Sequence, residues 1–155
     1  MKIKGLISED FVNYKKPAMT IMFPYCNFKC GTGYCQNSSL FHEANIEISV
    51  DDLVQRYINN PITEAIVMQG LEPFDSYQDV HQFISKLREY TDDDVVIYTG
   101  FYKEEITDQI SDLSKFKNII IKFGRFIPNE EKHFDEVLGV YLASNNQYAE
   151  RISND

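Results

Sequence analysis

Cysteine is nearly absent from the sequence. The chain has three cysteines, Cys26, Cys30 and Cys35, and all of them fall within one short segment. An odd number of cysteines in one cluster argues against a disulfide framework, which joins distant elements in pairs. Thiols gathered in this way are typical of metal ligands in a reducing compartment, so we expect a cytoplasmic protein.

Positive charge is also scarce. Fifteen Lys and Arg stand against 24 Asp and Glu, the formal net charge is −9, and neither sign forms a long run. This balance argues against a phosphate backbone or an anionic membrane as partner. No segment approaches the roughly 20 apolar residues that cross a bilayer, and the first residues lack the apolar core of a secretory signal. We therefore expect neither a nucleic acid nor a membrane as partner.

Linkers, low-complexity tracts and internal repeats are missing too, so the 155 residues predict one domain, 1–155. Apolar runs predict buried strands at residues 18–23, 65–68, 95–98, 118–123 and 137–142, and helical spacing of apolar residues marks 50–58, 80–87 and 106–113. Residues 3–8 and 11–16 predict an N-terminal hairpin or edge strand. This alternation predicts an α/β fold with a mainly parallel sheet of about five or six strands.

Several polar segments follow the predicted strands directly. Ligands of parallel α/β folds gather at the carboxyl ends of the strands. We therefore expect four segments to become neighbours there: the cysteine segment, residues 69–73, residues 99–100 and the loop after Leu142.

The three cysteines allow three interpretations. A structural zinc site would need a fourth ligand, for which His42 is available, but such sites usually present C-x2-C pairs and this chain has none. Small buried thiols are a second interpretation, which suits one cysteine better than three on a polar loop. The third is a 4Fe-4S cluster held by three protein ligands, which leaves one iron open to a further ligand. The spacing favours iron–sulfur over zinc.

The cysteine segment resembles that of the radical S-adenosylmethionine (radical SAM) superfamily. That superfamily usually carries C-x3-C-x2-C after its first barrel strand, with an aromatic residue before the last cysteine. This chain has C-x3-C, and Tyr34 precedes Cys35, but its second interval is C-x4-C. Gly31 and Gly33 in the longer interval tolerate the dihedral angles that a bulge needs. The resemblance implies that Cys26, Cys30 and Cys35 bind the cluster and that SAM binds its open iron.

A second motif strengthens this resemblance. Residues 69–73 read Gln-Gly-Leu-Glu-Pro, where the superfamily has a Gly-Gly-Glu-Pro-like turn that receives the amino group of SAM. A carboxylate at Glu72 suits an ammonium group, and Gly70 permits close approach of the backbone. The plainer interpretation is a strand-to-helix turn in which Glu72 favours the dipole of the next helix.

The whole chain is similar to the activating proteins of anaerobic ribonucleotide reductase. The shared features are Gly-Leu-Glu-Pro at 70–73, Tyr-Thr-Gly-aromatic at 98–101 and Ser-x-Asn-Gln at 144–147, whereas Lys-Phe-Gly-Arg-Phe at 122–126 departs from their Asp-Gly-Pro-Phe-like stretch. The resemblance implies an open partial (β/α) barrel. It also implies a cofactor site made of Tyr34, Gln69, Gly70, Glu72, Thr99, Lys122 and Asn145, with Asn146 as the alternative to Asn145, and no catalytic residue beyond the cluster ligands.

The resemblance implies an anaerobic radical SAM oxidoreductase. It would cleave SAM reductively to a 5'-deoxyadenosyl radical and generate a glycyl radical on a partner of the anaerobic ribonucleotide reductase type. A flavodoxin-like protein or another one-electron donor would supply the electron. Two alternatives stay open: a compact radical SAM enzyme that acts on a small molecule, and a non-catalytic metal-binding or electron-transfer module.

Metal analysis tests the choice between iron–sulfur and zinc. We predict that protein produced without oxygen holds about four irons and four sulfides per chain and shows an iron–sulfur charge-transfer shoulder. One tightly bound zinc without sulfide would contradict this prediction.

Overall fold

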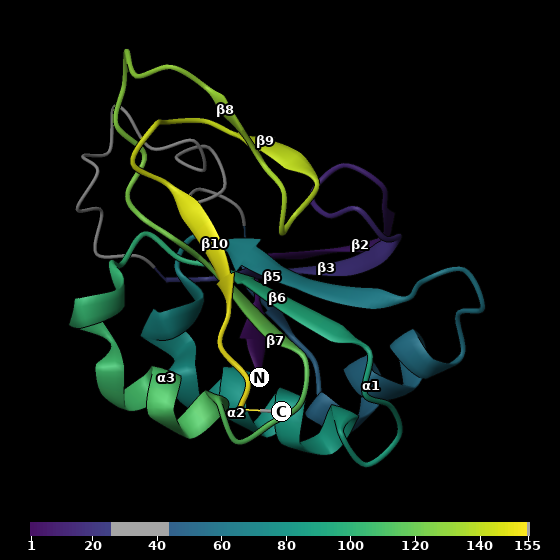
Figure 1. Ribbon diagram of the computed structural model, residues 1–155. Coiled ribbons are helices and arrows are strands. Elements are labelled where there is room, and N and C mark those ends of the chain that lie inside the picture. Colours follow the sequence, from purple (N-terminus) through teal and green to yellow (C-terminus); the bar gives the residue numbers. More distant parts are fainter. Residues whose placement is uncertain (26–43, 155) are drawn as a thin grey trace.

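The computed structural model describes residues 1–25 and 44–154 (Figure 1). Its centre is a six-stranded sheet in the order β10-β7-β6-β5-β3-β2. The four inner strands, β3 (Ala18–Phe23), β5 (Ala65–Gly70), β6 (Asp94–Tyr98) and β7 (Ile119–Phe123), are parallel, and β2 (Gly5–Asp10) and β10 (Tyr148–Arg151) run antiparallel at the two edges. The fold is therefore α/β with a mixed sheet, and within the described residues the sheet does not close into a barrel.

Three helices cover one face of the sheet: α1 (Val50–Ile58), α2 (Tyr77–Leu87) and α3 (Thr107–Leu113) (Figure 1). Ser49 caps α1, because its Oγ accepts a hydrogen bond from Asp52 N at 3.0 Å. Alternate residues of the strands point to this face, so that Met19, Ile21 and Phe23 pack with apolar residues of the helices. These three helices and the four inner strands confirm the corresponding predictions.

The opposite face is covered differently. Its strand side chains, which include Ala18, Ala65 and Val67, pack against Leu138 and Leu142. Those two leucines belong to the hairpin formed by β8 (His133–Asp135), β9 (Val140–Leu142) and the turn between them, which lies across the sheet from the helices (Figure 1). Short strands β1 (Lys2–Ile3) and β4 (Ile46–Glu47) pair beside the sheet, and 3-10 helices η2 (Pro73–Ser76) and η3 (Lys103–Glu105) precede α2 and α3.

The prediction of a strand over residues 137–142 in the main sheet is wrong. Only Val140–Leu142 form a strand, and it pairs with β8 in a separate two-stranded sheet. The sixth main strand is β10, which pairs antiparallel with β7. The N-terminal edge strand is confirmed as β2, but residues 11–16 form no strand.

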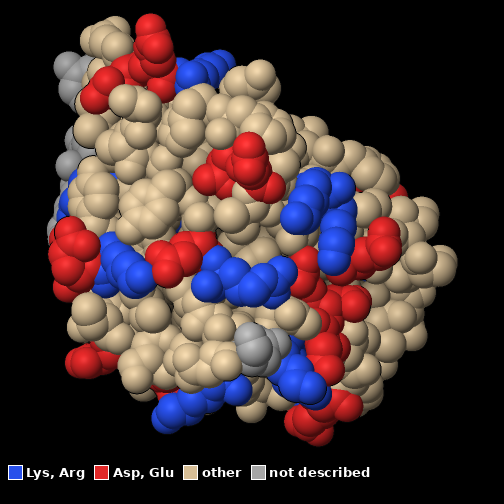
Figure 2. All heavy atoms as spheres, in the orientation of Figure 1, with Lys and Arg blue, Asp and Glu red and all other residues tan. Residues whose placement is uncertain are grey.

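Charged side chains of both signs are mixed over the surface drawn in Figure 2, where blue and red groups lie next to one another. Among the described helices, none has the length and apolar character needed to span a bilayer.

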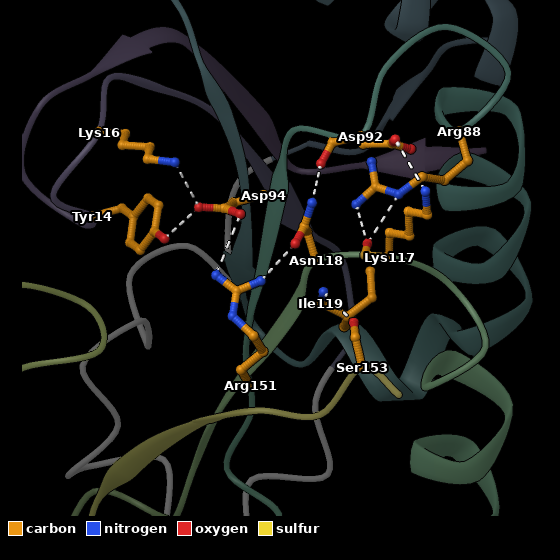
Figure 3. A network of polar contacts seen from close by, with 10 residues as sticks. All are labelled: Tyr14, Lys16, Arg88, Asp92, Asp94, Lys117, Asn118, Ile119, Arg151 and Ser153. Atoms are coloured by element: carbon orange, nitrogen blue, oxygen red, sulfur yellow. Dashed lines mark hydrogen bonds and ion pairs between the residues drawn. The ribbon is translucent and has the colours of Figure 1, made fainter. Parts of the chain in front are cut away.

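A polar network ties the amino-terminal ends of the parallel strands to β10, at the edge opposite the carboxyl ends (Figure 3). Asp94 begins β6 and is 6% exposed. Its Oδ2 accepts hydrogen bonds from Tyr14 Oη at 2.7 Å and Lys16 Nζ at 3.0 Å, and Arg151 Nη2 lies 3.5 Å from Oδ1. Arg151 also donates to Asn118 Oδ1. Asp94 therefore joins the N-terminal segment to the C-terminal strand β10.

We predict that Asp94→Asn lowers the free energy of unfolding by about 2 kcal/mol at neutral pH. Burial acts to raise the pKa of Asp94, but the hydrogen bonds from Tyr14 and Lys16 and the charge of Arg151 hold it below its usual value of 3.8. A depressed folded-state pKa stabilises the fold above the unfolded pKa, and this contribution is lost as the pH falls through the folded value. Urea unfolding from neutral pH to about pH 3 should therefore show the difference between variant and wild type shrinking below about pH 4.

The matched control is Asp92→Asn. The Asp92 carboxylate is 57% exposed and lies 3.7 Å from Lys117 Nζ, so its loss should change stability by less than about 0.5 kcal/mol. Equal effects of the two substitutions would contradict the role given to Asp94.

Candidate cofactor site

The carboxyl ends of the four parallel strands meet at one edge of the sheet. The register pairs Phe23 with Gly70, and Tyr98 with Lys122, so residues at or next to the ends of neighbouring strands lie side by side. A cavity of about 350 Å³ opens there. Its lining comes from the loop after β2, the turns after β5, β6 and β7, and the segment from β9 to β10: Val12, Asn13, Gln69, Gly70, Leu71, Glu72, Tyr98, Thr99, Gly100, Lys122, Gly124, Phe126, Val140, Tyr141, Leu142, Ala143 and Gln147.

Most of the described residues predicted to bind the cofactor line this cavity. They are Gln69, Gly70, Glu72, Thr99 and Lys122. Asn145 is exposed and does not belong to the lining. The loop after Leu142 does reach the site as predicted, although it arrives through the β8–β9 hairpin and not through a strand of the main sheet.

The predicted cluster ligands Cys26, Cys30 and Cys35 lie outside the described residues, and so does Tyr34. Among residues 1–25 and 44–154, no group of three or more His, Cys, Asp or Glu side chains is arranged to hold a metal ion. The described chain reaches Tyr25, the residue before Cys26, so the cysteine segment follows the end of β3 in the sequence.

Gly70 allows β5 to lie directly against the end of β3. Its φ is +93°, and a Cβ atom at this position would lie 2.4 Å from Phe23 N and 2.7 Å from Met22 Cα. Both neighbours are backbone atoms, which cannot move aside as a side chain can. The next residue, Leu71, donates its N–H to Phe23 O at 3.1 Å. Gly70 thus permits the contact that fixes the chain leading into the cysteine segment.

The carboxylate of Glu72 joins the turns after β5 and β6. Its Oε2 accepts from Phe74 N at 3.0 Å and from Thr99 Oγ1 at 2.8 Å, and its Oε1 accepts from Gly100 N at 2.8 Å. Glu72 is 4% exposed, and burial raises its pKa to about 7 although all three donors favour the ionised form. It also caps η2, as the plainer interpretation predicts. Among the described residues Oε1 accepts one hydrogen bond, which leaves it room for a second donor from a ligand.

Thr99 takes part in the same contact between the turns after β5 and β6. Its hydroxyl donates to Glu72 and accepts from Phe101 N at 3.0 Å, and the side chain is 2% exposed. The hydroxyl therefore shapes the cavity wall by fixing Glu72.

Lys122 is the one basic residue among the described lining residues, and Glu72 is the one acidic residue. The Lys122 side chain is buried, with 6% exposure, and its Nζ donates to Gly124 O at 3.1 Å and lies 5.7 Å from the centre of the Tyr98 ring. Burial raises the pKa of Tyr98, whose hydroxyl donates to Asn13 O. The cavity wall thus carries one group of each charge, which suits a ligand with both a carboxylate and an ammonium group.

The Ser-x-Asn-Gln segment reaches the cavity through Gln147, which the sequence analysis did not select. Asn146, the alternative to Asn145, has both ends of its amide engaged: Oδ1 accepts from Ser144 Oγ, and Nδ2 donates to Tyr102 Oη and Arg125 O. Gln147 is 4% exposed and lines the cavity. Its place in the Ser-x-Asn-Gln motif could have identified Gln147 from the sequence. Val12 and Tyr141 also line the cavity, but no motif marks them.

Comparison with protein families identifies one match. A family model described as a 4Fe-4S single cluster domain matches residues 17–148, which is most of the chain. Among curated proteins, no relative matches this sequence. The family match supports the predicted 4Fe-4S cluster and, with it, an iron–sulfur protein.

We predict that Gly70→Ala lowers the free energy of unfolding by about 2 kcal/mol or more and reduces the iron bound per chain. The added methyl group would overlap backbone atoms of β3, at a glycine with positive φ. The measurements are urea unfolding and iron analysis of protein produced without oxygen.

The control is Gly5→Ala in the edge strand β2, which pairs with the other side of β3. A Cβ atom there would meet Met22 Cε at 3.3 Å, and this flexible end of a side chain can move. Gly5→Ala should keep the wild-type iron content. If Gly70→Ala had the same stability and iron content as Gly5→Ala, the close approach of β5 to β3 would not have the effect described.

Proposed function

The chain belongs to the family of 4Fe-4S single cluster domains, and on that premise we propose that it is a radical SAM activase, which generates a glycyl radical on a partner enzyme. The observation that carries this proposal is the cavity with Glu72 and Lys122 in its wall, at the edge of the sheet where β5, β6 and β7 end. The end of β3, which precedes the cysteine segment, lies beside Gly70 of this wall. The methionine part of SAM carries an ammonium and a carboxylate group. Those charges match the two charged groups of the wall.

The cysteines Cys26, Cys30 and Cys35 would hold the cluster, because three thiolates suit a 4Fe-4S cluster with one open iron. When bound, such a cluster supplies one electron to the sulfonium of SAM, which separates into methionine and a 5'-deoxyadenosyl radical that takes a hydrogen atom from a glycine of the partner. The electron would come from a flavodoxin-like protein or another one-electron donor.

The chain itself binds and orients SAM. Glu72 accepts from the ammonium group through Oε1, while its other contacts keep the two turns in place. Lys122 pairs with the carboxylate, and Gln69 and Thr99 complete the polar part of the wall. Leu71, Phe126 and Leu142 supply an apolar part that excludes water.

A protein substrate is supported by the rim of the cavity. Val12 and Tyr141 line it and are 76% and 70% exposed, respectively. Exposed apolar side chains at the mouth of a site are typical of surfaces that receive another macromolecule. The partner we propose is a glycyl radical enzyme of the anaerobic ribonucleotide reductase type.

The test is SAM cleavage by the reduced protein. Wild type, reduced with dithionite without oxygen, should convert SAM to 5'-deoxyadenosine, and adding the partner should yield a glycyl radical in its electron paramagnetic resonance (EPR) spectrum. Cys30→Ala should hold no cluster and form no product. Glu72→Gln should keep the cluster and bind SAM about tenfold more weakly, because it loses a charge-assisted bond.

Each failure has a distinct meaning. A stable, redox-active cluster that never cleaves SAM would contradict the proposal and favour an electron-transfer module. SAM cleavage without radical transfer to any glycyl radical enzyme would favour a small-molecule substrate. Normal SAM affinity in Glu72→Gln would remove Glu72 from the binding site.

A further inference from the structure

We propose that Gln147 is a positioning residue that holds the ammonium group of Lys122 at the cavity wall through the carbonyl of Gly124. This inference rests on the proposed function, because it takes the carboxylate of SAM as the group that Lys122 receives. Gln147 acts on SAM through Lys122.

The carbonyl of Gly124 is shared by two donors. It accepts from Lys122 Nζ at 3.1 Å and from Gln147 Nε2 at 3.2 Å. The N–H of the same residue donates to Phe101 O at 3.0 Å, which fixes this turn to the one after β6. This carbonyl is therefore one of the groups that hold the Lys122 ammonium group in place.

Gly124 is packed closely against the segment that carries Gln147. Its φ is +107°, and a Cβ atom there would lie 3.2 Å from Asn146 O and 3.3 Å from Gln147 Cα. A side chain at this position would push the two segments apart. The contact is thus set by both the glycine and the segment before β10.

The amide of Gln147 is oriented by a second contact. Its Oε1 accepts from Ser144 N at 3.1 Å, so Nε2 is the end that faces Gly124. Both ends of this amide are paired and buried, so a rotation of the amide would break both hydrogen bonds.

Fixing Lys122 matters because a lysine has a long, flexible side chain. Its ammonium group is a point charge on a four-carbon stem, and it loses rotamer freedom when it binds a carboxylate. An ammonium group already held in place pays less of that cost at the moment of binding. Gln147 thereby raises the affinity for SAM without contacting its carboxylate.

A double-mutant cycle on SAM affinity tests this coupling. With the 4Fe-4S protein assembled without oxygen and titrated calorimetrically with SAM, Lys122→Met and Gln147→Met should each weaken binding, by about tenfold and about fivefold. The double variant should bind no more weakly than Lys122→Met alone, because Gln147 acts through Lys122. Additive effects would overturn the proposal.

A second variant guards against a loss of folding. Gln147→Glu keeps the oxygen that accepts from Ser144 N and removes only the donor to Gly124. We expect it to weaken SAM binding as Gln147→Met does, since the new carboxylate repels the Gly124 carbonyl and draws the ammonium group away from it. Glu150→Gln is the control: the Glu150 carboxylate is 41% exposed and pairs with Lys103, so its loss should leave SAM affinity unchanged.

A readout without SAM separates this inference from the proposed function. Competitive acetylation by acetic anhydride, followed by mass spectrometry, should label Lys122 at least about fivefold faster in Gln147→Met than in wild type. Lys86, on helix α2, should react at the wild-type rate. Failure of the wild type to bind SAM would refute the proposed function. If the wild type binds SAM and Gln147→Met shows the same Lys122 labelling and the same SAM affinity, the role of Gln147 is refuted.

Discussion

The buried carboxylate of Glu72 holds the cavity in shape. Donors from two successive turns converge on it, so the ends of β5 and β6 are joined by charge-assisted hydrogen bonds to a largely buried carboxylate. Burial raises its pKa to about 7, which means that its own environment only partly offsets the cost of the charge. An ammonium group of a ligand beside Oε1 would supply a further compensation. This carboxylate organises the site, and its charge would suit a cationic group of a ligand.

Two glycines with positive φ extend this arrangement to the neighbouring segments. Gly70 lets β5 approach the backbone at the end of β3, and Gly124 lets the turn after β7 approach the segment before β10. A Cβ atom would overlap backbone atoms at Gly70 and would be tightly packed against backbone atoms at Gly124, so backbone contacts place these strand ends. The cavity therefore lies between segments that are far apart in sequence but fixed relative to one another. Such a preformed wall is what a cofactor site with a reactive intermediate requires.

The sequence predicts the inner strands well because they are buried on both faces, so that residues 65–68 and 95–98 read as continuous apolar runs. It does not predict β10, since Tyr148–Arg151 is a short edge strand with charged side chains. The apolar pattern of residues 137–142 was misinterpreted for a physical reason. Leu138 and Leu142 are buried because they cover the second face of the sheet, without joining it.

The residues of the site likewise divide into those that a local sequence pattern predicts and those that depend on tertiary packing. Glu72, Thr99 and Lys122 were predictable because each is a polar residue at or just after the end of an apolar run. Val12, Asn13 and Tyr141 reach the cavity only through the packing of loops on the second face, which no local pattern predicts. Asn145 belongs to the Ser-x-Asn-Gln motif at 144–147, in which Gln147 is buried and Asn145 is exposed. Which of these residues faces the cavity depends on the path of the backbone, which the sequence does not show.

The central claim is that SAM binds an open iron of a cluster at this cavity. It is tested most directly by electron paramagnetic resonance and electron–nuclear double resonance on the reduced wild-type protein, with SAM that carries ¹⁷O in its carboxylate. The account predicts that SAM changes the cluster spectrum and that the carboxylate oxygen shows hyperfine coupling to it. A cluster spectrum that is identical with and without SAM would contradict the account.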